Sequence, residues 1–255
     1  MTAPSITSAT PNNIIGTGFI SDTVGVNMDS RWEFINNYND SIGAINGTPT
    51  GTINNINGLW GAGLAFTSGS HLTFGNVYDQ VTASTFSIGA VVKTPSSLPS
   101  TTAIITKAEV EGGSSNWLGY GMFIDVTTGA IFLVSGDAGA FHLVTGLGTT
   151  DLKDDAWHSL GLSWDGSDCR LYVDGVLENT VDVTSLVTIS NSYQFSINSA
   201  NNGTFNNAIE MAEAFFDETV WGASDFINFH EQTRHSVNNE KTPISITNST
   251  NAVSI

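Results

Sequence analysis

Short runs of alternating hydrophobic and polar residues, separated by Gly, Asn and Asp, cover the chain from Ser30 to about Gln232. Alternation with a period of two places successive side chains on opposite faces of a strand, whereas a helix requires a period near 3.6. The runs recur roughly every 8–12 residues, which is typical of sandwiches and barrels. We therefore predict an all-β domain. The predicted strands are Arg31–Phe34, Gly63–Phe66, His71–Phe74, Phe86–Lys93, Ala103–Lys107, Tyr120–Val126, Ala130–Ser135, Phe141–Thr145, His158–Trp164, Cys169–Val173, Val176–Val181, Gln194–Asn198 and Ile209–Phe216.

The segment Trp157–Thr180 has the clearest strand pattern. Leu160, Leu162 and Trp164 share one face of its first strand, and small or polar residues alternate with them on the other face. Asp174-Gly175 is a pair favoured in two-residue hairpin loops. The segment therefore predicts a three-stranded antiparallel meander with one buried face.

One short helix is predicted near the end of the domain, over Ser224–Gln232. Ser224 is a residue type preferred at the N-cap of a helix. We expect Phe226, Ile227 and Phe229 to face inward from this helix.

Three regions follow from these patterns. We predict an N-terminal arm over residues 1–24, a β-sandwich over residues 25–235 and a polar C-terminal tail over residues 236–255. The tail contains a short β-capable stretch, Ile244–Thr247, and the arm contains similar stretches. Such stretches are too short to form a core of their own.

Charge and composition exclude several classes of protein. The chain of 255 residues carries 24 acidic and 7 basic side chains, a net charge of −17, and it has no basic cluster to neutralise phosphates. We therefore expect no nucleic-acid partner. Its apolar runs are far shorter than the roughly 18 residues of a membrane-spanning helix, so we expect no membrane insertion. A single cysteine, Cys169, excludes an internal disulfide, and its strand position predicts a buried, unreactive thiol.

Seven sequence blocks occur in an order that carries a family resemblance. The blocks are Trp32–Phe34 with Asp40–Gly43 and Asn46–Thr48, Gly61–Phe66, Phe86–Lys93, Ile104–Lys107, Gly121–Asp125, Trp157–Gly175 and Phe205–Glu210. Together they resemble the laminin G-like domains of the concanavalin A-like lectin/glucanase superfamily, over about residues 30–232. Val91, Asn207 and Glu210 depart from the residues common in that family. The resemblance implies a two-sheet antiparallel jelly-roll sandwich, here with extended terminal arms, a fold that serves many functions.

The resemblance also implies a metal site. Members of this superfamily often hold a structural calcium at one edge of the sandwich, and the matching positions here are Asp40 and Glu210. Carboxylate and carbonyl oxygens are the ligands that calcium prefers. The alternative for Asp40 is a solvated turn residue.

Aromatic residues are the main candidates for binding a sugar, because an aromatic face packs well against the C–H face of a pyranose. Trp32, Trp157 and Trp164 lie in predicted strands and are expected to pack in the core. For Trp117, in a polar loop, stacking on a ligand and folding back into the protein are equally open. The candidate ligand-binding residues are Trp117, Tyr120, Trp60 and Trp221.

The chain shows none of the catalytic patterns associated with this superfamily. It lacks the glucanase strand in which alternate acidic residues point into one cleft. Glu210 and Glu213 are three positions apart and should project to opposite faces of a strand. The histidines have no metal-binding spacing, and His158 is expected to be a hydrogen-bonded structural residue. We therefore predict no catalytic residues.

The sequence thus predicts a non-catalytic recognition or adhesion module that binds glycans or a protein partner. The first class is a surface protein of a virion, such as a phage decoration, fibre or receptor-binding protein. The alternatives are a secreted, extracellular bacterial adhesin or carbohydrate-binding module, and a glycan-cleaving enzyme. The virion class is favoured because the sequence begins at Met1 without an export signal, and virion proteins leave the cell by lysis.

The two ends of the chain have two interpretations. They could add strands to another chain and hold the protein in a homo-oligomer or on a capsid or tail protein. They could equally be frayed ends, as termini commonly are.

Overall fold

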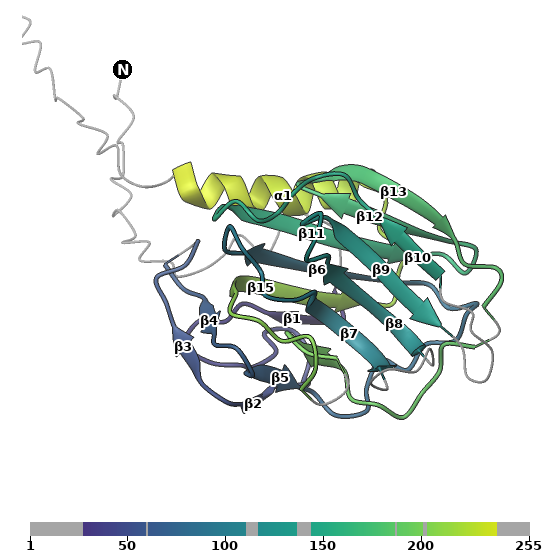
Figure 1. Ribbon diagram of the computed structural model, residues 1–255, viewed down its shortest axis with the longest axis horizontal. Helices are drawn as coiled ribbons and strands as arrows, with labels where there is room; N and C mark the ends of the chain where they lie inside the picture. Colours follow the sequence, from purple (N-terminus) through teal and green to yellow (C-terminus); the bar gives the residue numbers. More distant parts are fainter. Residues whose placement is uncertain are drawn as a thin grey trace, which may run out of the picture.

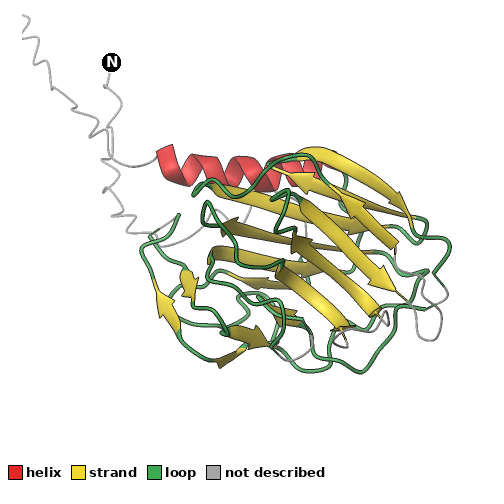
Figure 2. Ribbon diagram, in the orientation of Figure 1, coloured by secondary structure: helices red, strands yellow, loops and turns green. Residues whose placement is uncertain are grey.

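Two antiparallel sheets lie face to face, and a helix lies on the outer side of one of them (Figure 1, Figure 2). This computed structural model describes residues 28–59, 61–110, 117–136, 144–186, 188–200 and 203–238. The predicted all-β, two-sheet antiparallel sandwich is confirmed. None of the helices in the described ranges is long and apolar enough to cross a membrane. The predicted N-terminal arm and the stretch Ile244–Thr247 lie outside the described residues.

The first sheet has eight strands and carries the helix. Seven of them follow the order β13-β12-β11-β6-β15-β4-β3, and β1 also pairs with β15. Their bounds, in chain order, are β1 (Ser30–Trp32), β3 (Ile53–Asn55), β4 (Leu64–Phe66), β6 (Phe86–Lys93), β11 (Trp157–Trp164), β12 (Asp168–Val173), β13 (Val176–Asp182) and β15 (Glu210–Asp217).

The second sheet has seven strands in the order β10-β9-β8-β7-β14-β5-β2. Their bounds are β2 (Thr48–Thr50), β5 (His71–Thr73), β7 (Thr102–Val110), β8 (Trp117–Ile124), β9 (Ile131–Gly136), β10 (Val144–Leu147) and β14 (Ser196–Ile197). Strands β2 and β3 are not predicted from the sequence. Both are short and largely exposed, so they lack the alternation that a half-buried strand shows.

The predicted meander is strands β11, β12 and β13. Leu162 lies opposite Leu171 and Trp164 opposite Cys169, and all four side chains are fully buried. The β12–β13 turn places both Asp174 and Gly175 at positive φ, 51° and 77°, as its Asp-Gly sequence favours. Burial raises the pKa of the Cys169 thiol well above its usual value, which agrees with the predicted unreactive cysteine.

The main core lies between the sheets and is rich in aromatic rings. Trp32 and Trp164 are fully buried there, as predicted. Phe86 stacks on Trp164 with ring centroids 5.6 Å apart, and it also stacks with Phe216 at 6.1 Å. Trp157 differs from its prediction, because it is only partly buried and packs outside the eight-stranded sheet.

Helix α1 (Ala223–Asn238) covers the outer face of the eight-stranded sheet near β11 and β13 (Figure 1). Phe226 and Phe229 are buried against this face, as predicted. Ile227 is 48% exposed, so its predicted inward position is wrong. The predicted N-cap, Ser224, is also wrong, because the helix already begins at Ala223. The N-cap is Gly222, whose N–H donates a hydrogen bond of 2.8 Å to the Asp225 carboxylate.

Candidate functional site

Two of the predicted ligand-binding aromatics are buried. Tyr120 is fully buried between the sheets, and its hydroxyl donates to the carbonyl of Tyr78 at 2.7 Å. Trp221 is 2% exposed and stacks on Phe215 with centroids 4.1 Å apart. Their expected exposure is therefore wrong, because each ring is covered by its own protein. Trp60 and the side chain of Trp117 lie outside the described residues.

Asp40 organises a loop through its carboxylate. Its two oxygens accept five hydrogen bonds, from Ser30 Oγ at 2.5 Å and from the backbone N–H groups of Arg31, Ile42, Gly43 and Ile45 at 2.9–3.3 Å. Partial burial alone would raise the pKa of Asp40, but these hydrogen bonds lower it below its usual value. The carboxylate is thus already occupied by donors.

The structure does not bring Asp40 and Glu210 together. Asp40 is bonded to Ser30, which lies opposite Phe216 on β15, whereas Glu210 is the first residue of that strand. Six strand positions span roughly 20 Å at about 3.3 Å each. Calcium ligands must all lie within about 2.6 Å of one ion, so these residues do not fit a shared site. Within the described ranges, no group of three or more His, Cys, Asp and Glu is suited to a metal ion.

Glu210 instead lines a small surface pocket. The pocket has a volume of about 170 Å³ and lies where β4, the end of β6 and the start of β15 meet, in the part of the molecule where β3 and β4 lie in Figure 1. The residues that line it are Ala65, Phe66, Lys93, Pro95, Asp155, Ala208, Ile209 and Glu210.

Strand register places the charged residues of this pocket. Glu210 pairs with Lys93 on β6 and with Ala65 on β4, so the three lie in one row. Their neighbours Val92 and Met211 point into the main core, which directs Lys93 and Glu210 to the outer face. Lys93 Nζ lies 3.5 Å from Glu210 Oε2, and both side chains are about one-third exposed, at 29% and 35%.

The floor of the pocket is apolar, and its mouth is charged. Its accessible apolar residues are Ala65, Pro95 and Ala208. Phe66 and Ile209 also line it, but they are each 3% exposed and belong to the main core. Asp155 is exposed at the mouth, and its backbone N–H donates to the Thr94 carbonyl at 3.1 Å. Such a pocket can pack against C–H groups and exchange hydrogen bonds with hydroxyl groups.

A β-bulge between Met211 and Glu213 places Glu210 and Glu213 on the same outer face of the sheet, opposite Lys93 and Val91, so their expected opposite orientation is wrong. The two residues nevertheless do not form an open carboxylate pair. Glu213 is 2% exposed and pairs with Arg31 at 2.6 Å, whereas Glu210 pairs with Lys93. Burial raises the pKa of Glu213 above its usual value, although Arg31 opposes this effect. A glycosidase needs two carboxyl groups flanking one bond, and these two have different partners.

A second cluster, formed by Ser159, His158, His230 and Asp174, joins helix α1 to the meander. Ser159 Oγ and Asp174 Oδ1 approach the same His230 nitrogen, Nδ1, at 3.0 and 3.4 Å. A catalytic relay uses two different ring nitrogens, so this arrangement is not a relay. His158 bonds Asp174 at 2.7 Å and Asp154 at 3.2 Å. Its predicted role as a hydrogen-bonded structural residue is therefore confirmed.

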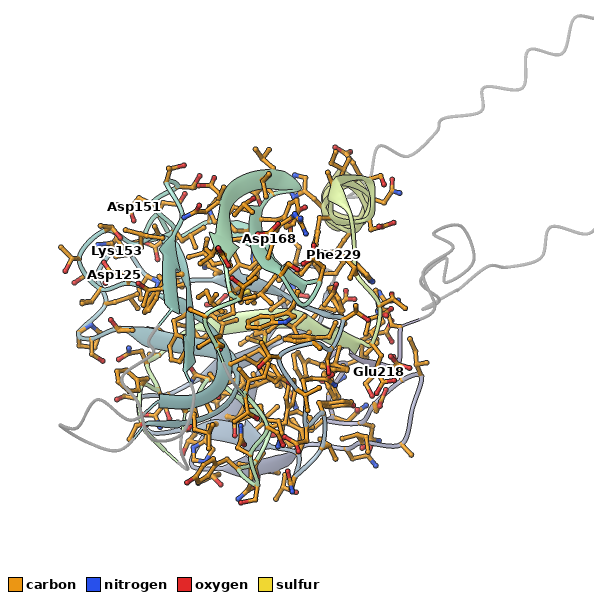
Figure 3. All side chains as sticks on the ribbon, turned by 90° about the vertical axis from the view of Figure 1, so that its right-hand side faces the viewer. Asp125, Asp151, Lys153, Asp168, Glu218 and Phe229 are labelled. Atoms are coloured by element: carbon orange, nitrogen blue, oxygen red, sulfur yellow. The ribbon has the colours of Figure 1, made fainter. Side chains whose placement is uncertain are left out.

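Charged residues also gather at the β8–β9 turn. Figure 3 shows Asp125, Asp151 and Lys153 together, on the opposite side of the molecule from Glu218. Lys153 Nζ donates to the carbonyls of Val126 and Thr127 at 2.9 and 3.0 Å, and Asp125 accepts hydrogen bonds from its own turn. These charges hold the turn closed, so the pocket beside Glu210 remains the stronger candidate site.

Of the three charged pocket residues, Glu210 is predicted from the sequence, whereas Lys93 and Asp155 are not. Lys93 ends a predicted strand, where a lysine usually serves solubility. Asp155 lies in a loop with several other acidic residues. Lys93 could have been recognised from the sequence by its position next to Val92 on β6. Because Val92 points into the core, Lys93 must point to the outer face of the sheet.

Comparisons with known proteins agree with this fold. A family model described as the concanavalin A-like lectin/glucanases superfamily matches residues 66–217, more than half of the chain. No curated protein matches the sequence. Structural similarity is found to the binding domain of Paraclostridial Mosquitocidal Protein 1, with a TM-score of 0.63, 12% identity and coverage of 80% of this chain and 52% of that one.

Two further similar structures contain sugars. The botulinum neurotoxin serotype D ligand binding domain, in complex with N-acetylneuraminic acid, has a TM-score of 0.60 and 13% identity, over 80% of this chain and 50% of that one. Domain 4 of AbnA, an extracellular arabinanase from Geobacillus stearothermophilus, in complex with arabinotriose, has a TM-score of 0.57 and 16% identity, over 80% and 98%. The chain spans about half the length of the toxin domains and nearly all of the arabinanase domain. The chain belongs to the concanavalin A-like lectin/glucanase superfamily.

Proposed function

We propose that this chain is a non-catalytic module that binds glycans through the pocket beside Glu210. The observation that carries the proposal is the composition of that pocket, an apolar floor with one ammonium and two carboxylate groups at its mouth. Two structures that contain a region similar to this chain were solved with sugars, a toxin ligand binding domain with N-acetylneuraminic acid and an arabinanase domain with arabinotriose, which supports a glycan as the ligand class.

The pocket suits one sugar residue. Its volume of about 170 Å³ is below the roughly 300 Å³ at which pockets for larger ligands begin. A ring that packs on Ala65 and Pro95 would place its hydroxyl groups at the mouth. Lys93 would donate hydrogen bonds to them, and Glu210 and Asp155 would accept. The remainder of a longer glycan would lie along the protein surface.

Binding without catalysis is supported by the partners of the polar groups. Glu213, which could have joined Glu210 as a second carboxylate, is buried and paired with Arg31. Ser159, which could have been a nucleophile, is 4% exposed and shares one nitrogen of His230 with Asp174. The two similar toxin structures are also described as binding domains.

A glycan array run with and without calcium tests for binding, and titration calorimetry with the best glycan then tests the site. We expect Glu210→Gln and Lys93→Met each to weaken binding about tenfold, because each removes a charged hydrogen-bonding group from the pocket. Glu218→Gln is the matched control, since Glu218 is exposed at the other end of β15. Absence of binding across the array, or an equal loss in the control, would contradict the proposal.

The setting of the module is a separate proposal. We place it on a virion surface, held there by a capsid or tail protein, with a secreted adhesin or carbohydrate-binding module as the alternative. Mass spectrometry of purified particles tests this directly. Detection of the chain in stoichiometric amounts would support the virion setting, and its presence only in the particle-free supernatant would support secretion.

A further inference from the structure

We propose that the pocket prefers a sugar that carries a free, protonated amine over a neutral or an acidic sugar, an inference that rests on the proposed glycan-binding function. The charges of the pocket lead to this preference. Lys93 is the cation that lines it, and its ammonium group already faces Glu210 at 3.5 Å. Asp155 adds a second carboxylate, so the pocket carries one more negative charge than positive charge.

The carboxylate of Asp155 has no hydrogen bond or ion pair with any residue that the structure describes. Its neighbour Asp154 differs in this respect, because Asp154 accepts hydrogen bonds from Ala156 N–H at 2.9 Å and contacts His158 at 3.2 Å. Asp155 is therefore the acidic group at the pocket mouth that remains available to a ligand.

The backbone fixes where this carboxylate lies. Asp155 has a φ of 60°, in the left-handed region that non-glycine residues seldom adopt, and its N–H is held by the Thr94 carbonyl at 3.1 Å. Aspartate tolerates this conformation better than most side chains do. The loop before β11 is thus pinned to the loop after β6, and Asp155 is presented at the mouth between them.

The net charge of the whole protein also favours a cationic sugar over an acidic one. With a net charge of −17, the protein repels uronic and sialic acids and attracts cations before contact. Attraction by the net charge changes little when any single carboxylate is removed. A direct contact with the amine, by contrast, is lost when its own carboxylate partner is removed. The preference at the pocket must therefore depend on Asp155 more than on any other single acidic residue of similar exposure.

The test compares three disaccharides at pH 6 by ligand-observed NMR and calorimetry. They are β-1,4-linked diglucosamine, its fully N-acetylated form and cellobiuronic acid, which share a pyranose scaffold and differ in charge. We expect the amine form to bind about three- to tenfold more tightly than the acetylated form and the acidic form to bind most weakly. The difference should shrink in 0.5 M NaCl, because salt screens partly exposed charges.

Two variants make the test specific. Asp155→Asn should remove the preference for the amine, because it should weaken binding of the amine form more than binding of the acetylated form. Glu218→Gln, which removes one negative charge elsewhere, should keep the preference. Equal binding of the amine and acetylated forms, tightest binding of the acidic form, or an unchanged preference in Asp155→Asn would each overturn the inference and leave glycan binding in place. Absence of binding by all three disaccharides and by an array of longer glycans would overturn both proposals.

Discussion

Gly161 on β11 lies directly under the ring of Phe226 on α1, so close that a methyl group at Gly161 would overlap that ring. Gly89 lies opposite Gly161 on β6 and receives the ring of Phe215 in the same way. Two glycines paired across neighbouring strands thus form a shallow seat for aromatic rings. Helix α1 rests on this seat, and the helix in turn covers the outer face of the sheet.

This contact predicts the effect of adding one methyl group. Gly161→Ala should lower the free energy of unfolding by about 1–3 kcal/mol, because the buried ring of Phe226 must move. Urea denaturation followed by tryptophan fluorescence measures the loss. Ser163→Ala is the control on the same face of β11, since the Ser163 hydroxyl is buried without a partner and its removal should cost little. An equal effect of both substitutions would contradict the proposed seat.

The core face of β11 predicts a second stability effect. Leu162→Ala should cost about 2–5 kcal/mol, because Leu162 is fully buried between the sheets. Leu177→Ala on the exposed edge strand β13, where the side chain is 48% exposed, should cost much less. Chemical denaturation of the two variants compares them, and a loss below about half a kilocalorie for Leu162→Ala would show that this face is not core.

His158 predicts a dependence of stability on pH. The hydrogen bond to Asp174 raises the pKa of His158 above its usual value, with Asp154 adding to the effect and burial opposing it. A group whose pKa is raised on folding stabilises the protein fully below its unfolded pKa, about 6.5 for histidine. That stabilisation is lost as pH rises from there through the folded pKa.

Unfolding measured in urea from about pH 5.5 to 8.5 checks this sign. The wild type should lose stability across the upper part of this range, and His158→Gln should show a smaller loss. His71 is a useful comparison, because burial lowers its pKa and its effect has the opposite sign. A steeper decline in His158→Gln than in the wild type would contradict the assignment.

Asp40 gives a test that separates loop ordering from calcium binding. Asp40→Asn should lower the melting temperature, because it weakens five hydrogen bonds that order the loop, two of which join it to β1. We expect the same decrease in excess calcium and in chelator. Calcium binding by the chain remains a prediction of the family resemblance. A decrease seen only in calcium would identify Asp40 as a metal ligand.

The sequence was sufficient to predict the features that depend on local pattern. The β11–β13 meander follows from alternation and from Asp174-Gly175, and the order of the motifs indicates the superfamily. Strands β2 and β3 escaped prediction because an exposed edge strand need not alternate. The start of the helix was predicted to within one residue and its buried Phe226 and Phe229 were predicted correctly, but α1 extends to Asn238 instead of ending at Gln232. Ile227 was expected to face inward, but it lies beside the β12–β13 turn and remains exposed.

The site was harder to predict because its residues depend on tertiary neighbours. Tyr120 and Trp221 are residue types that often bind sugars, but other parts of the chain cover their rings. Asp40 and Glu210 match a family motif, but β15 separates them. Lys93 and Asp155 are ordinary in the sequence and become notable only because β6, β15 and the loop before β11 meet at one pocket.

The most direct test of the account maps a bound glycan onto the protein by NMR. The best glycan from the array is titrated into isotopically labelled protein, and backbone amide shifts are followed. We expect the largest changes at Ala65, Lys93, Asp155 and Glu210, around the pocket. Changes confined to the outer face of the seven-stranded sheet, near Phe132 and Leu147, with the pocket amides unmoved, would contradict it.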